Sequence, residues 1–278
     1  MREPLIRVEK ASKRFCRDPR RRFRLAAADI VRELCGGETR DELRAGEFWA
    51  LRDVDLQVWP GEVVGVIGHN GSGKSTLLNL VAGLFLPTTG AVTTFARRVC
   101  RVDQGGTISP HETGRENILM QLALHGVPSG STADEVAAIA RFADLEQHLD
   151  APVGTYSSGM RGRLGFAIYA RLLPDLFLID ETLGGGDRRF RERFREYLEG
   201  YVSEGGSMLL CLHDAATIRS LCDRVLLLDQ GKPVLTGQAD EAIDAYDAIA
   251  AARGRSLLAE PRGRRGHRRP RSRMPAPH

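Results

Sequence analysis

The sequence has little cysteine and no long apolar run. Its five cysteines are odd in number and show neither the paired spacing of a metal site nor a C-x-x-C redox motif, so we expect free, mostly buried thiols. No stretch approaches the roughly 18 to 20 uninterrupted apolar residues that a membrane-spanning helix needs. The basic N-terminus lacks the apolar segment of a signal peptide. We therefore expect a cytosolic globular protein, for which 278 residues give ample material for a buried core.

The net charge of +4 comes from the C-terminal end. Residues 253–278 hold nine arginines and one acid, a formal charge of +8, which leaves −4 for the rest of the chain. This Pro- and Gly-rich tail has too few apolar residues to bury, so we expect it to be disordered. A second basic cluster runs from Lys13 to Arg24. For both clusters two interpretations stay open: solvated surface charge, or attraction to anionic lipid or nucleic acid.

Short runs of Val, Ile and Leu alternate with longer helical stretches, which is typical of a mostly parallel α/β sheet. The apolar runs predict buried strands at 61–68, 175–180 and 207–213, and a late strand and hairpin at 224–237. Between Gly114 and Arg171 the periodicity predicts three helices and no strand, hence a helical lobe inserted into the α/β core. The pattern of the arginine-rich residues 16–47 is ambiguous.

A phosphate-binding loop is the strongest motif. The segment GHNGSGKST at 68–76 satisfies G-x-x-x-x-G-K-[ST] and lies between a predicted strand and an amphipathic helix. Gly71 and Gly73 allow backbone N–H groups to surround a β-phosphate, Lys74 reaches the β- and γ-phosphates, and Ser75 offers its hydroxyl to Mg²⁺. The alternative, a glycine turn with an incidental lysine, is disfavoured by the flanking strand and helix.

Two carboxylates and a histidine end later strands. Asp180 follows an apolar strand, and Glu181 comes directly after it. Beside a phosphate loop, Asp180 suits orienting Mg²⁺ and Glu181 suits polarising the attacking water as general base. His213 ends another strand and suits a donor to the γ-phosphate. The alternatives are helix caps for the two acids and an ordinary structural residue for the histidine.

A Ser-Ser-Gly turn precedes the last predicted helix of the lobe, in TYSSGMRGRLGFAIYA at 155–170. The start of a helix presents unpaired N–H groups and a positive dipole end. This turn therefore suits an anion.

The order of these motifs resembles that of the nucleotide-binding subunit of an ATP-binding cassette (ABC) transporter. Gln104 lies six residues before Pro110, where the coupling glutamine of the family sits, and YSSGM occupies the signature position. Asp187 closes the loop that follows the two carboxylates, and His213 matches the switch histidine. The resemblance covers about residues 5–250.

The resemblance implies an α/β fold with a P-loop NTPase core of the ABC type, an inserted helical subdomain at about 114–171 and an N-terminal antiparallel β portion. It implies one nucleotide-binding domain over residues 1–252, followed by the disordered tail 253–278. In the family, the signature turn of one subunit holds the γ-phosphate of ATP bound to another, so two chains enclose two nucleotides. We therefore expect a homodimer that binds ATP and Mg²⁺ and hydrolyses ATP.

The residue roles follow position by position. Glu181 and His213 are the predicted catalytic residues, and Ser75, Gln104 and Asp180 are the predicted Mg²⁺ site. Phe15 is the candidate for stacking on adenine, with a strand-end core residue as the alternative, whereas Trp49 is expected in the core. The predicted ATP-binding set is Phe15, Gly68, His69, Asn70, Gly71, Ser72, Gly73, Lys74, Ser75, Thr76, Gln104, Ser157, Ser158, Gly159 and Asp187.

Within the family, the segments around the phosphate loop, TGRENI and TYSSGM resemble the subgroup that exports bacterial surface polysaccharides such as O-antigen, capsule or teichoic acid. The arginine-rich insert before Phe48 is similar too, and so are Ser158 and Met160, which replace the Gly and Gln usual in the broad family. The loop at 182–187 is more glycine-rich than we expect for the subgroup. Some members carry a C-terminal β-sandwich that binds the glycan, whereas here we expect only the basic tail.

The subgroup implies a separate multi-span permease, a peripheral position on the cytoplasmic face of the inner membrane, and a polysaccharide that the chain contacts only indirectly. One alternative is a soluble cassette ATPase acting on DNA or the ribosome. The sequence shows neither the inserted coiled coils of the chromosome type nor the two cassettes of the translation type. A non-hydrolysing binding module is the other alternative, which the presence of Lys74, Asp180, Glu181 and His213 disfavours. We expect no nucleic acid partner.

Overall fold

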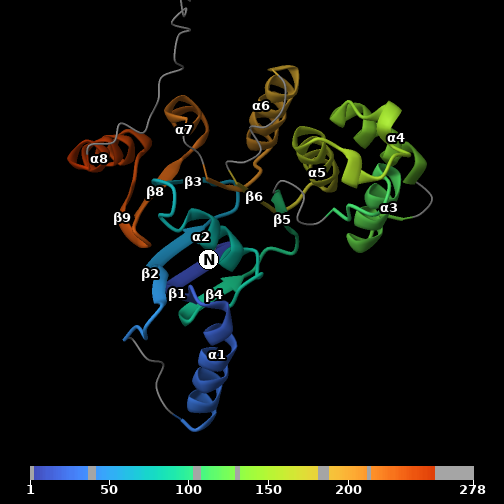
Figure 1. Ribbon diagram of the computed structural model, residues 1–278. Helices are drawn as coiled ribbons and strands as arrows, with labels where there is room; N and C mark the ends of the chain where they lie inside the picture. The colour runs from blue at the N-terminus through green and yellow to red at the C-terminus, as the bar shows by residue number, and fades with distance from the viewer. Residues whose placement is uncertain are drawn as a thin grey trace, which may run out of the picture.

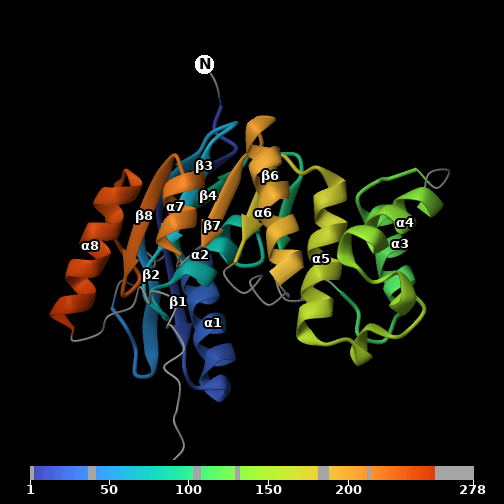
Figure 2. The same ribbon diagram turned by 90° about the horizontal axis from the view of Figure 1, so that it is seen from above.

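The computed structural model describes residues 3–36, 42–102, 108–128, 132–180, 188–211 and 214–253. These residues form a six-stranded sheet, a three-stranded sheet and helices around them, with a helical lobe set to one side (Figures 1 and 2). Gln104, Glu181, Asp187, His213 and the tail after residue 253 lie outside the described residues. In the part of the chain that is described, no helix is long and apolar enough to cross a membrane.

The six-stranded sheet is the centre of the molecule. In spatial order its strands are β5 (Val99–Val102), β6 (Leu176–Ile179), β7 (Met208–Cys211), β3 (Val63–Ile67), β8 (Arg224–Asp229) and β9 (Lys232–Gly237). The first five run parallel, and β9 returns antiparallel to β8 as the predicted hairpin. Every residue of β3, β6 and β7 is buried, because helices or the second sheet cover both faces of this parallel sheet. The predicted strands are confirmed.

The three-stranded sheet is antiparallel, with β1 (Ile6–Cys16) between β2 (Glu47–Val58) and β4 (Thr89–Thr94). Helix α2 (Lys74–Val81) packs its apolar side chains into one core together with both sheets. This confirms the N-terminal antiparallel portion, and it sets the residues that precede α2 against the end of the β1–β2 ladder.

The helical lobe consists of α3 (Gly114–Leu124), α4 (Thr132–Ala143) and α5 (Ser158–Leu172), as predicted. Thr113 and Glu116 form a capping box that begins α3. Asn117 is fully buried, and its amide nitrogen donates to the carbonyl oxygens of Ser109 and Thr113, at 3.0 and 2.9 Å. Asn117 of the lobe therefore holds Ser109, which precedes α3.

Four further α-helices, α1 (Pro19–Leu34), α6 (Arg188–Ser203), α7 (Ala215–Leu221) and α8 (Ala239–Ala252), and two short 3-10 helices in the lobe, η2 (Glu146–His148) and η3 (Val153–Thr155), complete the described chain. Helix α1 accounts for part of the ambiguous arginine-rich stretch and projects beyond the three-stranded sheet in Figure 1. All five cysteines are free, and Cys100 and Cys211 are buried, whereas Cys35 is exposed. Burial raises the pKa of Cys100 to about 12, so this thiol stays protonated at neutral pH.

Candidate functional site

The phosphate-binding loop lies between β3 and α2, and its glycines have conformations that other residues rarely adopt. Gly68, Gly71 and Gly73 have φ angles of 152°, 83° and 109°. A Cβ on Gly73 would lie 2.6 Å from the carbonyl oxygen of Ala50, so the loop is packed directly against β2. Around Gly71 there is open space, because a Cβ there would meet nothing within 4 Å. The loop is thus tight at its base and open at its tip.

Lys74 closes this loop from inside. Its side chain is buried, and Nζ donates to the carbonyl oxygens of Gly68 at 2.6 Å and His69 at 3.3 Å. No side chain caps the N-terminus of α2, where Gly73 is the N-cap residue. The positive dipole end of this helix favours an anion, and a lysine lies at the same place.

The loop forms one side of an open cavity of about 440 Å³. We call the residues from the phosphate-binding loop, with Asp180, the loop end of the cavity, and Phe15, Phe48 and Trp49 the aromatic end. The cavity is lined by Phe15, Phe48, Trp49, Ala50, Asn70, Gly71, Gly73, Lys74, Ser75, Thr76 and Asp180. A cavity with cationic and backbone donors at one end and aromatic rings at the other suits a nucleotide, whose phosphates and base differ in the same way.

The loop end also holds oxygen donors for a cation. Asp180 follows β6 and is buried, and its carboxylate lies 3.8 Å from a guanidinium nitrogen of Arg101. Ser75 lines the same cavity. A carboxylate and a hydroxyl beside a phosphate site are the donor set that Mg²⁺ takes in proteins, so these residues fit the ion.

The aromatic end is built by the β1–β2 ladder, in which Phe15 pairs with Phe48 and Arg14 with Trp49. The Phe15 ring packs edge-on against Phe85 at 5.6 Å, and Lys13 Nζ lies 5.5 Å from the Phe15 ring centroid. Phe15 thus lines the cavity and also packs against a neighbouring ring.

The expectation that Trp49 is a core residue is wrong, because its half-buried ring lines the cavity. Guanidinium groups of Arg14 and Arg52 lie 5.7 and 5.8 Å from this ring. Sequence reasoning also missed Phe48. The adjacent aromatic pair at the start of a strand, opposite Phe15, was the signal that could have found both residues.

The signature turn lies outside this cavity. Ser157 is the N-cap residue of α5, and its hydroxyl accepts a hydrogen bond of 3.2 Å from the N–H of Met160. Ser157 and Ser158 are exposed, and Gly159 is half-buried. None of the three lines the cavity. A single chain therefore does not bring its own signature turn to its phosphate-binding loop.

A second ion-pair group supports the loop from the side of β8 and α8. Arg253, just after α8, makes two 2.7 Å contacts with the carboxylate of Asp229. His69 of the loop lies 3.7 Å from Asp229 and 3.2 Å from Arg253 through its Nε2. The predicted domain boundary at residue 252 stays a prediction, and Arg253 is bound to the folded part of the chain.

The chain resembles proteins of one family throughout. The ABC transporter family pattern matches residues 51–184. The ABC transporter protein AbcA of Aeromonas salmonicida is 39% identical over 202 residues, 73% of this chain and 66% of that protein. The O-antigen export system ATP-binding protein RfbB of Klebsiella pneumoniae is 35% identical over 209 residues, 75% of this chain and 85% of that protein.

A third relative, the teichoic acids export ATP-binding protein TagH of Lactococcus lactis, is 35% identical over 87% of this chain, which spans 50% of its length. Among solved structures, an ATP-binding subunit of an ABC transporter matches with a TM-score of 0.66 and 23% identity, over 90% of this chain and 93% of that one. A dimeric ATP-binding cassette in a post-hydrolysis state with ADP and Pi matches with a TM-score of 0.65 and 20% identity, over 84% and 99%.

These structures have the same fold as the chain, and the RfbB relative shares more than a third of its residues with it over most of the length of both. The chain belongs to the ABC transporter family of ATP-binding proteins and has the fold of an ABC-type ATPase.

Proposed function

We propose that this protein is the ATP-hydrolysing subunit of an exporter that moves a polysaccharide across the cytoplasmic membrane through a separate multi-span permease. The cavity that joins the phosphate-binding loop to an aromatic end supports the binding of ATP, on which the proposal rests. The named export functions of the RfbB and TagH relatives support a glycan as the cargo, lipid-linked O-antigen, capsule or teichoic-acid-like.

At the loop end, Lys74 is the residue that changes partners. It now donates to two carbonyl oxygens of its own loop, and a triphosphate would offer it stronger, charged acceptors. Ser75 and Asp180 would hold Mg²⁺, together with Gln104. When bound, the ion would offset the negative charge of the phosphates. This would lower the free-energy cost of burying them beneath a second subunit. Arg101, beside Asp180, is close enough to neutralise this carboxylate until the ion arrives.

Hydrolysis is assigned to residues of the two loops that follow β6 and β7. We propose Glu181 as the general base that polarises water, His213 as the donor to the γ-phosphate, and Asp187 as the residue that closes the loop between protomers. In the sequence, Glu181 and Asp187 follow β6 and His213 follows β7, as the phosphate-binding loop follows β3, and this order supports the assignment.

The exposed signature turn is explained by a composite site. Ser157, Ser158 and Gly159 do not line the cavity of their own chain. We therefore expect them to contact the γ-phosphate of ATP bound to a partner chain. Two copies in a head-to-tail, two-fold arrangement satisfy both turns at once. Such a dimer would sit as a peripheral subunit on the cytoplasmic face of the inner membrane, beneath its permease.

The first test measures ATP binding and phosphate release for the wild type and for Glu181→Gln. Because the phosphate cradle stays intact, Glu181→Gln should bind Mg-ATP with unchanged affinity and release phosphate about 100-fold or more slowly. Glu204→Gln, at an exposed site beyond α6, is the matched control and should hydrolyse at the wild-type rate. Hydrolysis by Glu181→Gln at the wild-type rate would remove Glu181 from this role.

The second test concerns the partner. Affinity purification of the protein from native membranes, followed by identification of the co-purified chains, should recover a multi-span permease encoded beside glycosyltransferases. Recovery of ribosomal proteins or nucleic acid instead would favour the soluble cassette ATPase.

A further inference from the structure

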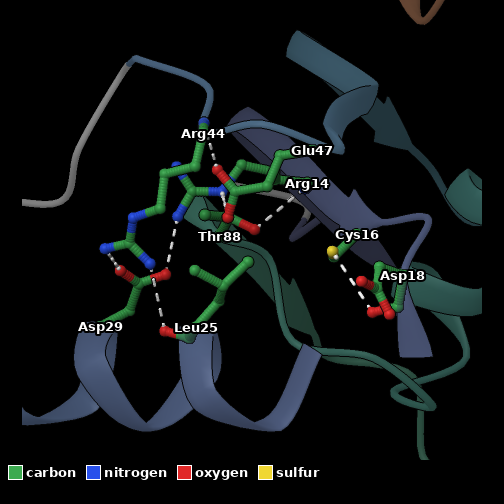
Figure 3. A network of polar contacts seen from close by, with 8 residues as sticks. All are labelled: Arg14, Cys16, Asp18, Leu25, Asp29, Arg44, Glu47 and Thr88. Atoms are coloured by element: carbon green, nitrogen blue, oxygen red, sulfur yellow. Dashed lines mark hydrogen bonds and ion pairs between the residues drawn. The ribbon is translucent and has the colours of Figure 1, made fainter. Parts of the chain in front are cut away.

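Helix α1 is attached to the three-stranded sheet by charged groups. None of its described side chains belongs to the buried apolar core. Figure 3 shows the contacts that hold it: the carboxylate of Asp29 lies between two guanidinium groups, 2.8 Å from Arg14 and 2.6 Å from Arg44. Arg44 also contacts the carbonyl oxygen of Leu25, one turn earlier in the helix, at 3.4 Å. Among the described contacts, these ion pairs join α1 to the residues of the three-stranded sheet and its preceding turn.

Glu47, at the start of β2, completes a network of two cations and two anions. Its carboxylate lies 3.5 Å from Nε of Arg14 and accepts a 2.7 Å hydrogen bond from the backbone N–H of Arg44. The side chains of Arg14 and Glu47 are only 5% and 4% exposed. A buried guanidinium that loses a carboxylate partner is strongly disfavoured, so Asp29 and Glu47 both stabilise the position of Arg14.

This network ends at the aromatic end of the cavity. Arg14 stands opposite Trp49 in the β1–β2 ladder, and its guanidinium lies 5.7 Å from the Trp49 ring. The next residue, Phe15, lines the same cavity. Arg14 therefore contacts both Asp29 of the inserted helix and the cavity-lining ring of Trp49. A cation over an indole face is an attractive contact.

We propose that Asp29 is a positioning residue for nucleotide binding: through Arg14 it holds Trp49 and Phe15 in the arrangement that receives the base. The proposal rests on the proposed function, because it takes an adenine nucleotide as the ligand. The network contains no residue of the loop end. Loss of Asp29 should therefore weaken the part of the affinity that comes from the base and leave the part that comes from the phosphates.

Linkage makes the effect reciprocal. If the docked position of α1 favours a ligand that carries a base, that ligand stabilises the docked position of α1 by the same free energy. A ligand without a base should not do so. This gives a readout at residues 19–34, away from the phosphate-binding loop.

The experiment measures binding of ADP and of inorganic tripolyphosphate to the full chain by calorimetry. Asp29→Asn should bind ADP about 10-fold more weakly, because it removes the charge-assisted contact with Arg14, whose guanidinium lies beside the Trp49 ring. Its affinity for tripolyphosphate should stay within about 2-fold of the wild type. Asp240→Asn is the matched control, because Asp240 pairs with Arg219 at 2.7 Å at an exposed site away from the cavity. It should leave both affinities unchanged. Asp29→Glu keeps the charge, so it should weaken ADP binding less and leave tripolyphosphate binding unchanged. This variant tests the proposal if Asp29→Asn does not fold.

Hydrogen exchange supplies the second readout. ADP should slow the exchange of the α1 amides in the wild type, tripolyphosphate should not, and in Asp29→Asn neither ligand should. Equal loss of affinity for both ligands, or for neither, would overturn the proposal. A wild-type protein that binds neither ligand would contradict the proposed function itself, whereas a wild type that binds both and a normal Asp29→Asn would contradict only the role of Asp29.

Discussion

The two ends of the cavity are held in place by different means. The loop end consists mainly of consecutive residues, fixed by glycines with positive φ and by hydrogen bonds within the loop and to neighbouring strands. The aromatic end brings together residues from two strands, and Arg14 beside the Trp49 ring is paired with Asp29 of an inserted helix. Backbone geometry encoded within nine residues therefore fixes one end, and contacts between distant side chains fix the other.

The largest effect is expected from breaking the loop end. Lys74→Ala should bind both ATP and inorganic tripolyphosphate about 100-fold or more weakly, because charge-assisted hydrogen bonds to phosphate are worth up to about 3 kcal/mol. Calorimetric titration of both ligands measures this, with Lys232→Ala on the exposed face of β9 as the control. If Lys74→Ala lowers the affinity for ATP but not for tripolyphosphate, the loop end does not bind the phosphates independently of the aromatic end.

A pair of glycine substitutions sharpens the same comparison. Both glycines have positive φ, so alanine is strained at either site, but a Cβ on Gly73 would also lie 2.6 Å from the Ala50 carbonyl oxygen. Gly73→Ala should therefore lower the free energy of unfolding by about 3 kcal/mol, and Gly71→Ala by about 1 kcal/mol. Denaturant unfolding without nucleotide gives both values. Equal losses would show that the contact with β2 does not hold the base of the loop.

The same contrast explains what the sequence could predict. The strands, the three helices of the lobe and the phosphate-binding loop follow from apolar periodicity and a local motif, and the structure confirms the helices and strands. Trp49 is expected in the core, and nothing in its local sequence shows that its ring lines a cavity. Helix α1 was not predicted, since its composition is basic and the described contacts that dock it are ion pairs with residues such as Arg14.

The smallest effect is expected from the tail, which contains neither end of the cavity. A chain that stops after Arg253 should keep ATP binding, hydrolysis and dimerisation. It should bind anionic vesicles less well at low salt, because each basic side chain near such a surface is worth about 1 kcal/mol. Vesicle co-sedimentation across a salt series, without permease, measures this. Equal binding by full-length and shortened chains would favour the interpretation as solvated charge.

Stopping one residue earlier provides the matched comparison, because it also removes the ion pair with Asp229. That pair is partly exposed, so its loss should lower the stability only slightly. If the two shortened chains have the same melting temperature and ATP affinity, the Arg253–Asp229 ion pair does not support the loop end.

We propose that the signature turn of a second chain completes the cavity, and light scattering of Glu181→Gln with Mg-ATP measures the dimer that such a site requires. We expect Glu181→Gln to shift from monomer to dimer, and the added Ser157→Arg to prevent this while monomeric ATP affinity stays unchanged. Ser203→Arg, which places the same charge at an exposed site beyond the cavity, should leave the dimer intact. Dimerisation of the Glu181→Gln, Ser157→Arg protein at the same ATP concentration as Glu181→Gln alone would contradict the composite site.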